Sequence, residues 1–290
     1  MRYRQRCEAS RNALSCRNVY CSAVSGQASC GAVLPRSATL PAPSFLPLKR
    51  DMSETSESSA LDRALLPARL IEGYQSFLGG HFRREQDRYR QLAERGQSPK
   101  ILLIGCCDSR VSPEVIFDAL PGEIFVLRNI ANLVPPYEPD AVHHGTSAGL
   151  EYAVRILNVE HIVVMGHARC GGVRAYVEQA ADPARAVIVP GDFIGRWMSL
   201  IAPAAAKLGP RTEPIEIYAE RLGQAAIIDT LANLRSFPYV RDAEMAGRLA
   251  LHGAYFGVAD GRLHGLDEAT GTFHHIAAKA HAAALATPRF

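Results

Sequence analysis

The spacing of apolar positions changes along the chain and predicts alternating helices and strands. Between residues 65 and 95 apolar side chains recur every three or four positions, which is typical of helices, and Gly79-Gly80 divides this stretch in two. Three short apolar runs follow, at Ile101–Gly105, Ile124–Leu127 and His161–Gly166. Runs of this length suit the buried strands of a parallel sheet.

Helical patterns lie between and after these runs. Ser112-Pro113-Glu114 predicts a short helix with Ser112 as its N-cap and Pro113 at the first helical position. Longer helices are predicted over His144–Leu157, from Gly171-Gly172 to about Ala180, over Asp192–Lys207 and over Thr212–Leu234. The alternation indicates an α/β fold, a mainly parallel β-sheet core flanked by helices on both faces. The sequence also predicts a C-terminal strand/hairpin extension. It consists of two further strands, Leu249–Val258 and Leu263–Leu266, which are joined by Ala-Asp-Gly.

Composition narrows the class of protein. The 290 residues are 48% hydrophobic and 21% charged, which excludes a fully disordered chain or a coiled coil. No apolar run approaches the roughly 18 residues of a membrane helix, so we expect no membrane span. The net charge of +3 combines +7 over residues 1–50 with −4 over residues 51–290. Because residues 51–290 have a net charge of −4, their composition does not indicate a basic surface, so we expect no nucleic-acid partner.

The basic segment at the start differs from the rest. Residues 1–50 are rich in Arg, Ser, Ala and Pro and show no sustained period, while Met52 opens a polar Ser/Glu stretch. Three interpretations stay open: sequence upstream of the true start, an organelle transit peptide, and a disulfide framework built on four cysteines. We expect a disordered extension over residues 1–55, one folded domain over residues 56–280 and a frayed tail over residues 281–290. The expected location is the cytoplasm, with organellar targeting as the alternative.

The remaining cysteines fall where ligand sites of α/β proteins lie. Cys106-Cys107-Asp108-Ser109-Arg110 follows the first strand, and His167-Ala168-Arg169-Cys170 follows the third. Ligand sites of open α/β sheets gather at the carboxyl ends of the strands. Two thiolates and an imidazole suit Zn²⁺, and three protein ligands leave a fourth position open, as in catalytic zinc sites. Two alternatives are that the cysteines are small buried hydrophobes, or that Cys106 and Cys107 form a redox pair.

Asp108 and Arg110 are two residues apart and can pair on this loop. A neighbouring guanidinium lowers the pKa of a carboxyl group and keeps it ionised, so Asp108 could accept a hydrogen bond from a zinc-bound water. The alternative is an ion pair that closes the loop and contributes little.

These motifs together resemble the β-class carbonic anhydrases. The resemblance rests on Cys-x-Asp-Ser-Arg followed by Gly-His-x-x-Cys-Gly-Gly, and on further segments in the same order: Pro121-Gly122-Glu123, Arg128 to Pro136, Glu151-Tyr152-Ala153-Val154 and Leu251-His252-Gly253. It covers roughly Ala60 to Ile276. Leu102-Leu103-Ile104, where the other subgroup often has Trp, favours the plant-like type.

The resemblance implies roles residue by residue. One Zn²⁺ per subunit would be bound by Cys106, His167 and Cys170, with Cys107 as a non-ligand. Asp108 would orient the zinc-bound hydroxide, and Arg110 would hold Asp108. The substrate pocket would comprise Gln97, which would bind bicarbonate, the apolar wall Phe125, Ile130 and Tyr152, and the backbone N–H of Gly171.

The same resemblance implies the activity and the assembly. The expected reaction is reversible hydration of carbon dioxide to bicarbonate and a proton, and the alternative is a non-catalytic zinc protein of this fold that binds bicarbonate. A homodimer or a higher multiple of dimers is expected, with the N-terminal helices packing on the partner subunit. Histidines at 143, 144 and 161 are proton-relay candidates, but none is assigned.

Overall fold

The computed structural model describes residues 65–139, 143–181 and 193–276, all within one compact unit of the chain, Asp62–Phe290. The extension expected over residues 1–55 and the tail expected over residues 281–290 lie outside the described residues. Among the described residues, no helix is long and apolar enough to cross a membrane.

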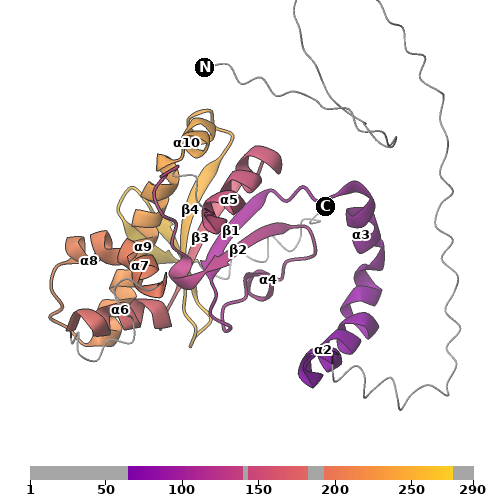
Figure 1. The fold of residues 1–290 in the computed structure, drawn as a ribbon, viewed down its shortest axis with the longest axis horizontal. Coiled ribbons are helices and arrows are strands. Elements are labelled where there is room, and N and C mark those ends of the chain that lie inside the picture. Colours follow the sequence, from indigo (N-terminus) through magenta and orange to yellow (C-terminus); the bar gives the residue numbers. More distant parts are fainter. Residues whose placement is uncertain (1–64, 140–142, 182–192, 277–290) are drawn as a thin grey trace, which may run out of the picture. The chain divides into compact units, whose positions relative to one another are not determined.

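A six-stranded sheet with the order β2-β1-β3-β4-β5-β6 forms the centre of the fold (Figure 1). The first four strands in this order are parallel and the last two pairings are antiparallel. The predicted parallel core and C-terminal hairpin are therefore confirmed. The last strand was not predicted, because it is a short, mostly exposed segment without an apolar run. The bounds are β1 Ile101–Cys106, β2 Ile124–Asn129, β3 His161–His167, β4 Ala250–Phe256, β5 Leu263–Asp267 and β6 Thr272–His275.

The helices follow the predicted alternation, with three differences. The predicted Asp192–Lys207 helix is divided into two α-helices by a 3₁₀ turn, the predicted His144–Leu157 helix ends in a π-helical turn, and α10 was not predicted. Ser112 is the N-cap residue of α4 and Pro113 is its first residue, as predicted, but the Ser112 hydroxyl donates to Glu114 Oε2 at 2.9 Å and caps no backbone N–H. The bounds are α2 Ala68–Gly79, α3 His81–Arg95, α4 Pro113–Ile116, η1 Ile130–Asn132, α5 Gly145–Glu151, η2 Tyr152–Ile156, α6 Gly171–Ala181, α7 Phe193–Met198, η4 Ser199–Ile201, α8 Ala202–Leu208, α9 Ile215–Ser236 and α10 Pro238–Met245.

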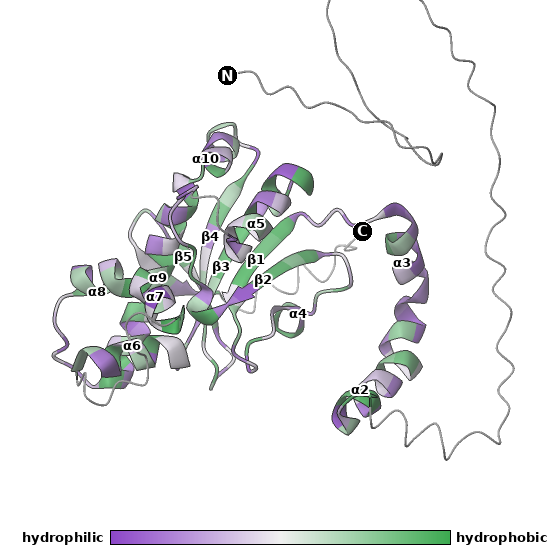
Figure 2. Ribbon diagram, viewed as in Figure 1, coloured by the Kyte–Doolittle hydropathy of each residue, from purple (hydrophilic) through white to green (hydrophobic). Residues whose placement is uncertain are grey.

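The main core lies between one face of the sheet and the helices α5, η2 and α9. Strand residues such as Ile104 and Val164 alternate with residues that point to the other face, and they pack with Leu150 and Leu231. Figure 2 shows the central strands β1, β2 and β3 mostly in the green of hydrophobic residues. This packing fixes the strand ends that carry the candidate site.

The opposite face of the sheet is covered less completely. Leu103, Met165 and Ala254 pack there with Ile116 of α4 and with Phe117. Beside them runs a groove of about 710 Å³, lined in part by the apolar strand residues Leu103, Val163 and Leu263.

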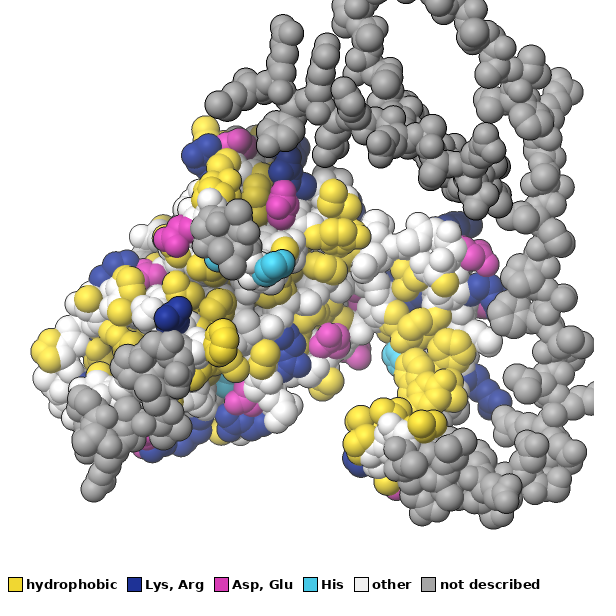
Figure 3. Space-filling model, viewed as in Figure 1, with side chains coloured by type: hydrophobic (Ala, Val, Ile, Leu, Met, Phe, Trp, Pro, Cys, Tyr) yellow, Lys and Arg dark blue, Asp and Glu magenta, His cyan; other side chains and the backbone are white. Residues whose placement is uncertain are grey.

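The N-terminal helices α2 and α3 carry apolar side chains but bury none of their residues. Leu70 and Tyr74 are each 59% exposed, and Figure 3 shows hydrophobic side chains gathered on these helices. Arg88 of α3 donates to the carbonyl of Pro121 at 2.6 Å, which ties this helix to the loop before β2.

Candidate metal centre

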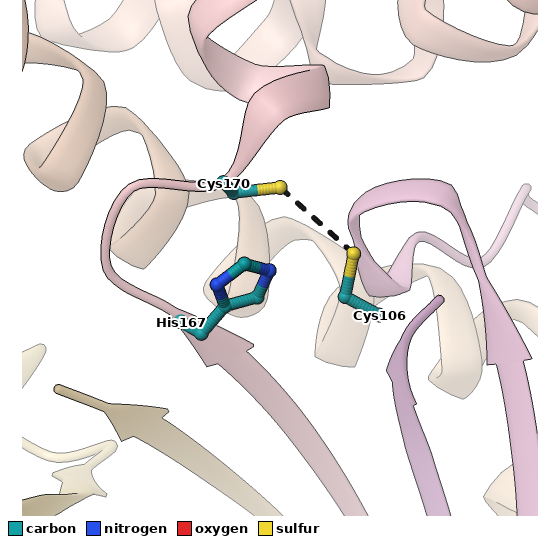
Figure 4. Close-up of side chains that lie close together, drawn as sticks. All are labelled: Cys106, His167 and Cys170. Atoms are coloured by element: carbon teal, nitrogen blue, oxygen red, sulfur yellow. Dashed lines mark hydrogen bonds between the residues drawn. The ribbon is translucent and has the colours of Figure 1, made fainter. Parts of the chain in front are cut away.

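Three buried side chains meet at the carboxyl end of the sheet. Cys106 is the last residue of β1, His167 is the last residue of β3, and Cys170 directly precedes α6. Because β1 and β3 are parallel neighbours, their carboxyl ends lie side by side. The ligand atoms of the three residues lie within 4.8 Å of one another, and the two sulfur atoms are 4.0 Å apart (Figure 4).

The imidazole of His167 is oriented as a metal ligand would be. Its Nδ1 lies 2.9 Å from the carbonyl oxygen of Ala168, and since a carbonyl only accepts hydrogen bonds, Nδ1 carries the proton. Nε2 therefore has a free lone pair, yet it is buried and has no hydrogen-bond partner. A buried polar atom without a partner is costly, and a metal ion coordinated by Nε2 removes that cost. The donor set of two sulfurs and one nitrogen fits Zn²⁺.

The electrostatics of the two thiols favour one thiolate even without a metal. The hydrogen bond from the Cys170 thiol lowers the pKa of Cys106, and His167 and the backbone N–H groups of Asp108 and Ala131 lower it further. The same sulfur–sulfur contact raises the pKa of Cys170, and burial adds to that increase. A cation between the sulfurs would favour both thiolates, since metal ligation deprotonates a thiol.

Asp108 and Arg110 form an ion pair beside the cluster. Asp108 Oδ1 accepts from the Arg110 backbone N–H at 3.0 Å and from Nε at 2.9 Å, while Oδ2 accepts from an outer guanidinium nitrogen at 2.7 Å. These hydrogen bonds hold the pKa of the Asp108 carboxyl well below its usual range. Oδ2 also lies 4.0 Å from His167 Nε2, so the ionised carboxylate borders the candidate metal position.

The second cysteine of the first motif lies apart from the cluster. Cys107 is exposed, whereas Cys106 and Cys170 are buried, and all three are free thiols. Its backbone N–H donates to the carbonyl of Asn129 at 2.8 Å, which joins the loop after β1 to the end of β2.

The structure brings together only some of the residues expected to bind substrate. Gly171 directly follows Cys170, and Ile130 packs against Gly172, where an added Cβ would lie 2.9 Å from Ile130 Cγ2. Both residues therefore lie at the same strand ends as the cluster.

Gln97, Phe125 and Tyr152 lie farther from the cluster of their own chain. Phe125 stacks on Tyr152 with ring centroids 5.9 Å apart, and its strand partner is Leu102, four positions before Cys106. At about 3.3 Å per residue, Phe125 is roughly 13 Å along the sheet from that ligand. Gln97 precedes the start of β1, at the opposite end of the strand from Cys106.

Two side chains on β2, Arg128 and Asn129, support the site, although the sequence analysis assigned no role to either of them. Arg128 donates from Nε to the carbonyl of Cys106 at 2.8 Å and from an outer nitrogen to that of Asp108 at 2.7 Å. Asn129 joins the two ends of the turn that follows β2. The available signal was their position, since both stand at the end of a predicted strand beside the first cysteine motif.

The comparisons with known proteins all point to the same family. The family model described as "Carbonic anhydrase" matches residues 101–263. The chain is similar to "Beta carbonic anhydrase 3" of Arabidopsis thaliana, with 35% identity over 213 residues, which is 71% of this chain and 80% of that protein.

Two solved structures resemble the fold. The β-carbonic anhydrase CcaA gives a TM-score of 0.61 at 30% identity, covering 72% of this chain and 91% of that chain. A structure described with two tetrameric β-carbonic anhydrases from the filamentous ascomycete Sordaria macrospora gives a TM-score of 0.54 at 30% identity, covering 76% of this chain and 100% of that chain.

Proposed function

The chain belongs to the β-class carbonic anhydrase family, and from this premise we propose that it catalyses the reversible hydration of carbon dioxide to bicarbonate and a proton. The observation that carries the proposal is the buried cluster of Cys106, His167 and Cys170, in which His167 Nε2 has no hydrogen-bond partner.

Cys106, His167 and Cys170 would hold one Zn²⁺ per subunit. When bound, the ion supplies a Lewis acid that lowers the pKa of a coordinated water. The three side chains are well placed to retain it, because they end two neighbouring strands and begin a helix, and each is buried.

Asp108 positions the reacting water, and Arg110 positions Asp108. Both carboxylate oxygens of Asp108 already accept hydrogen bonds from Arg110, which fixes the orientation of the carboxylate and keeps it ionised. An ionised carboxylate accepts a hydrogen bond from the reacting oxygen and directs a lone pair of that oxygen towards carbon dioxide. This role requires the carboxylate beside the cluster and does not require it to coordinate the metal.

Carbon dioxide is small and apolar, so an apolar wall with few polar groups suits it. Ile130 supplies part of that wall, and the N–H of Gly171 at the start of α6 stabilises the negative charge that develops on the substrate oxygens. Gln97, Phe125 and Tyr152 are placed too far away to complete the pocket of their own chain.

We infer that a second copy of the chain brings these three residues to the site. Tyr152 is 46% exposed. The apolar side chains Leu70 and Tyr74 of α2 and the groove on the less covered face of the sheet are also unburied in one copy. A two-fold dimer in which the N-terminal helices pack on the partner covers these surfaces and assembles each pocket from both subunits.

A subunit-mixing experiment tests the shared pocket. Gln97→Ala and Asp108→Asn are each expected to reduce activity strongly as homodimers. If the pocket is shared, mixed dimers contain one intact site, and an equimolar mixture after unfolding and refolding recovers about a quarter of the wild-type activity per subunit. If each chain supplies its own Gln97, mixing recovers no activity.

The central test combines zinc stoichiometry with stopped-flow measurement of carbon dioxide hydration on the purified chain. One zinc per subunit together with hydration activity supports the proposal. Zinc and bicarbonate binding without hydration activity would instead support the non-catalytic alternative, and a chain without zinc would contradict both.

The division at residue 55 and the cytoplasmic location are also proposals. We expect the chain begun at Met52 to keep full zinc content and activity, because every residue assigned to the site lies after residue 95. Fractionation of cells that express the full and the shortened chain tests whether residues 1–51 direct the protein to an organelle.

A further inference from the structure

Two histidines meet at the amino end of the sheet, on its less covered face. His161 is the first residue of β3, and His252 lies near the start of β4. In the register of these parallel strands His161 lies opposite Ala250 and His252 lies opposite Val163, so the two histidines are diagonal neighbours on one face. His161 Nδ1 is 3.1 Å from His252 Nε2. The pair lies at the opposite end of β3 from His167 and the cysteine cluster.

The separation of the two nitrogens fits one shared metal ion. Two imidazole nitrogens that bind a tetrahedral Zn²⁺ at about 2.0–2.1 Å are roughly 3.3 Å apart. The contact in the structure is a hydrogen bond, in which one ring donates and the other accepts. A metal takes a lone pair from both rings, so the donating ring moves its proton to its other nitrogen. Both histidines are exposed, so water can accept a hydrogen bond from that nitrogen.

The charges around the pair suit a cation. Partial burial lowers the pKa of His252, and His161 lowers it further, which favours the neutral imidazole that a metal requires. Carboxylates interact electrostatically with both rings, that of Glu160 with His161 and that of Glu268 with His252. Glu160 is also paired with Lys100 at 2.7 Å, so the nearest cation is already balanced.

An ion can reach the pair from two sides. His252 lines the groove of about 710 Å³ on the less covered face of the sheet. His161 lines a separate depression of about 660 Å³, which also contains Lys100, Glu160 and Arg248. The second approach stays available when a partner subunit covers the groove.

We propose that His161 and His252 form a second metal site, which binds a divalent transition metal ion of the class that prefers imidazole, such as Zn²⁺, Ni²⁺ or Cu²⁺. His161 Nδ1 and His252 Nε2 are the two protein ligands, and water fills the remaining positions. The bound ion joins β3 to β4 through their side chains. This site goes beyond the proposed reaction and does not depend on it.

Nickel binding tests the proposal, because nickel can be counted separately from the zinc of the cysteine cluster. The full chain, loaded with zinc and free of any affinity tag, is dialysed against NiCl₂, and both metals are then measured. We expect the wild type to bind one more Ni²⁺ per subunit than either His161→Asn or His252→Asn. Nickel should also raise the unfolding temperature of the wild type more than that of either variant.

His275→Asn is the matched control. His275 is an exposed histidine on β6, and its ring contacts that of His264 with centroids 5.5 Å apart. This variant should bind as much nickel as the wild type, and loss of the same ion from it would overturn the assignment. Equal nickel binding by the wild type and both site variants would also overturn the proposal, as would loss in only one folded variant, because a shared ion needs both rings.

Two readings keep this test separate from folding and from the proposed reaction. If one site variant fails to fold, the other decides, since removal of either ring removes the shared ion. A chain without zinc would contradict the proposed function alone. The nickel comparison still decides the second site in that case, because the cysteine cluster is identical in all four proteins.

Discussion

Substitution of Asp108 by Asn separates catalysis from zinc binding and from folding. The change keeps the shape of the side chain but replaces an ionised acceptor by an amide. The Asn oxygen can replace only one of the two carboxylate oxygens that Arg110 now contacts. An amide nitrogen facing the guanidinium opposes two donors, so the side chain loses its fixed orientation.

The expected effect on stability is small. The Asp108 side chain is 17% exposed and that of Arg110 is 48% exposed, so solvent screens the pair. A partly exposed ion pair of this kind contributes about 1 kcal/mol or less to the free energy of unfolding. The expected effect on rate is much larger, because a positioned proton acceptor contributes about 10²- to 10⁴-fold, or roughly 3–5 kcal/mol of activation free energy.

Three measurements decide the outcome. Stopped-flow hydration should fall at least about a hundredfold, zinc content should stay at one per subunit, and urea unfolding should change little. Glu160→Gln is a suitable control, since it removes a carboxylate paired with Lys100 at 2.7 Å at the other end of the sheet. A variant with wild-type rate would refute the role of Asp108, and loss of zinc would show that Asp108 is itself a ligand.

Three further predictions concern the metal, the core and acid stability. Cys106→Ser should lose zinc and activity while Cys107→Ser keeps both, as metal analysis and hydration assays of the purified proteins would show. The reverse pattern would show that Cys107, and not Cys106, is the ligand. Ile227→Ala should lower the free energy of unfolding by about 2–5 kcal/mol in urea titrations, because this side chain is fully buried between α9 and the sheet; a change below about 1 kcal/mol would contradict that packing. The Arg235 guanidinium lowers the pKa of Glu268 below its ordinary value of 4.5, so this pair stabilises the fold above that pH and loses its effect as the pH falls through the folded pKa. Glu268→Gln should therefore be less stable than wild type at pH 7, by less than about 1 kcal/mol since Glu268 is 41% exposed, and equally stable near pH 3; the opposite pH trend would contradict the assignment.

The sequence brought Cys106, His167 and Cys170 together correctly because the ends of strands are easy to locate. Cys106 and His167 each close an apolar run, and parallel strands bring such ends together whatever lies between them. The position of Gln97 was harder to interpret. A motif match assigns a role but not the subunit in which the role is performed. The predicted strand over Ile101–Gly105 already placed Gln97 before its start, at the opposite end from Cys106, and the structure confirms that order.

Local geometry without a distinctive residue type was not predictable. A glycine would have marked the turn at Ala131, but alanine gives no sign of a positive φ, and tertiary contacts impose the conformation. Helix α10 and strand β6 were missed for a similar reason, since both are short and neither presents a sustained apolar pattern.

The order of the strands also has a consequence for how the chain folds. Cys106 and Cys170 are separated by 64 positions, and they meet only after β1 has paired with β3. Before that pairing, the growing sheet offers a metal ion single donors or the His167–Cys170 pair, so tight binding is a late event. A ligand that binds only the folded chain stabilises it by mass action, by about 2.7 kcal/mol at a hundredfold excess over its dissociation constant. With the proposed zinc site, the supply of zinc during folding would therefore affect how much of the chain is folded, as well as how much of it is active.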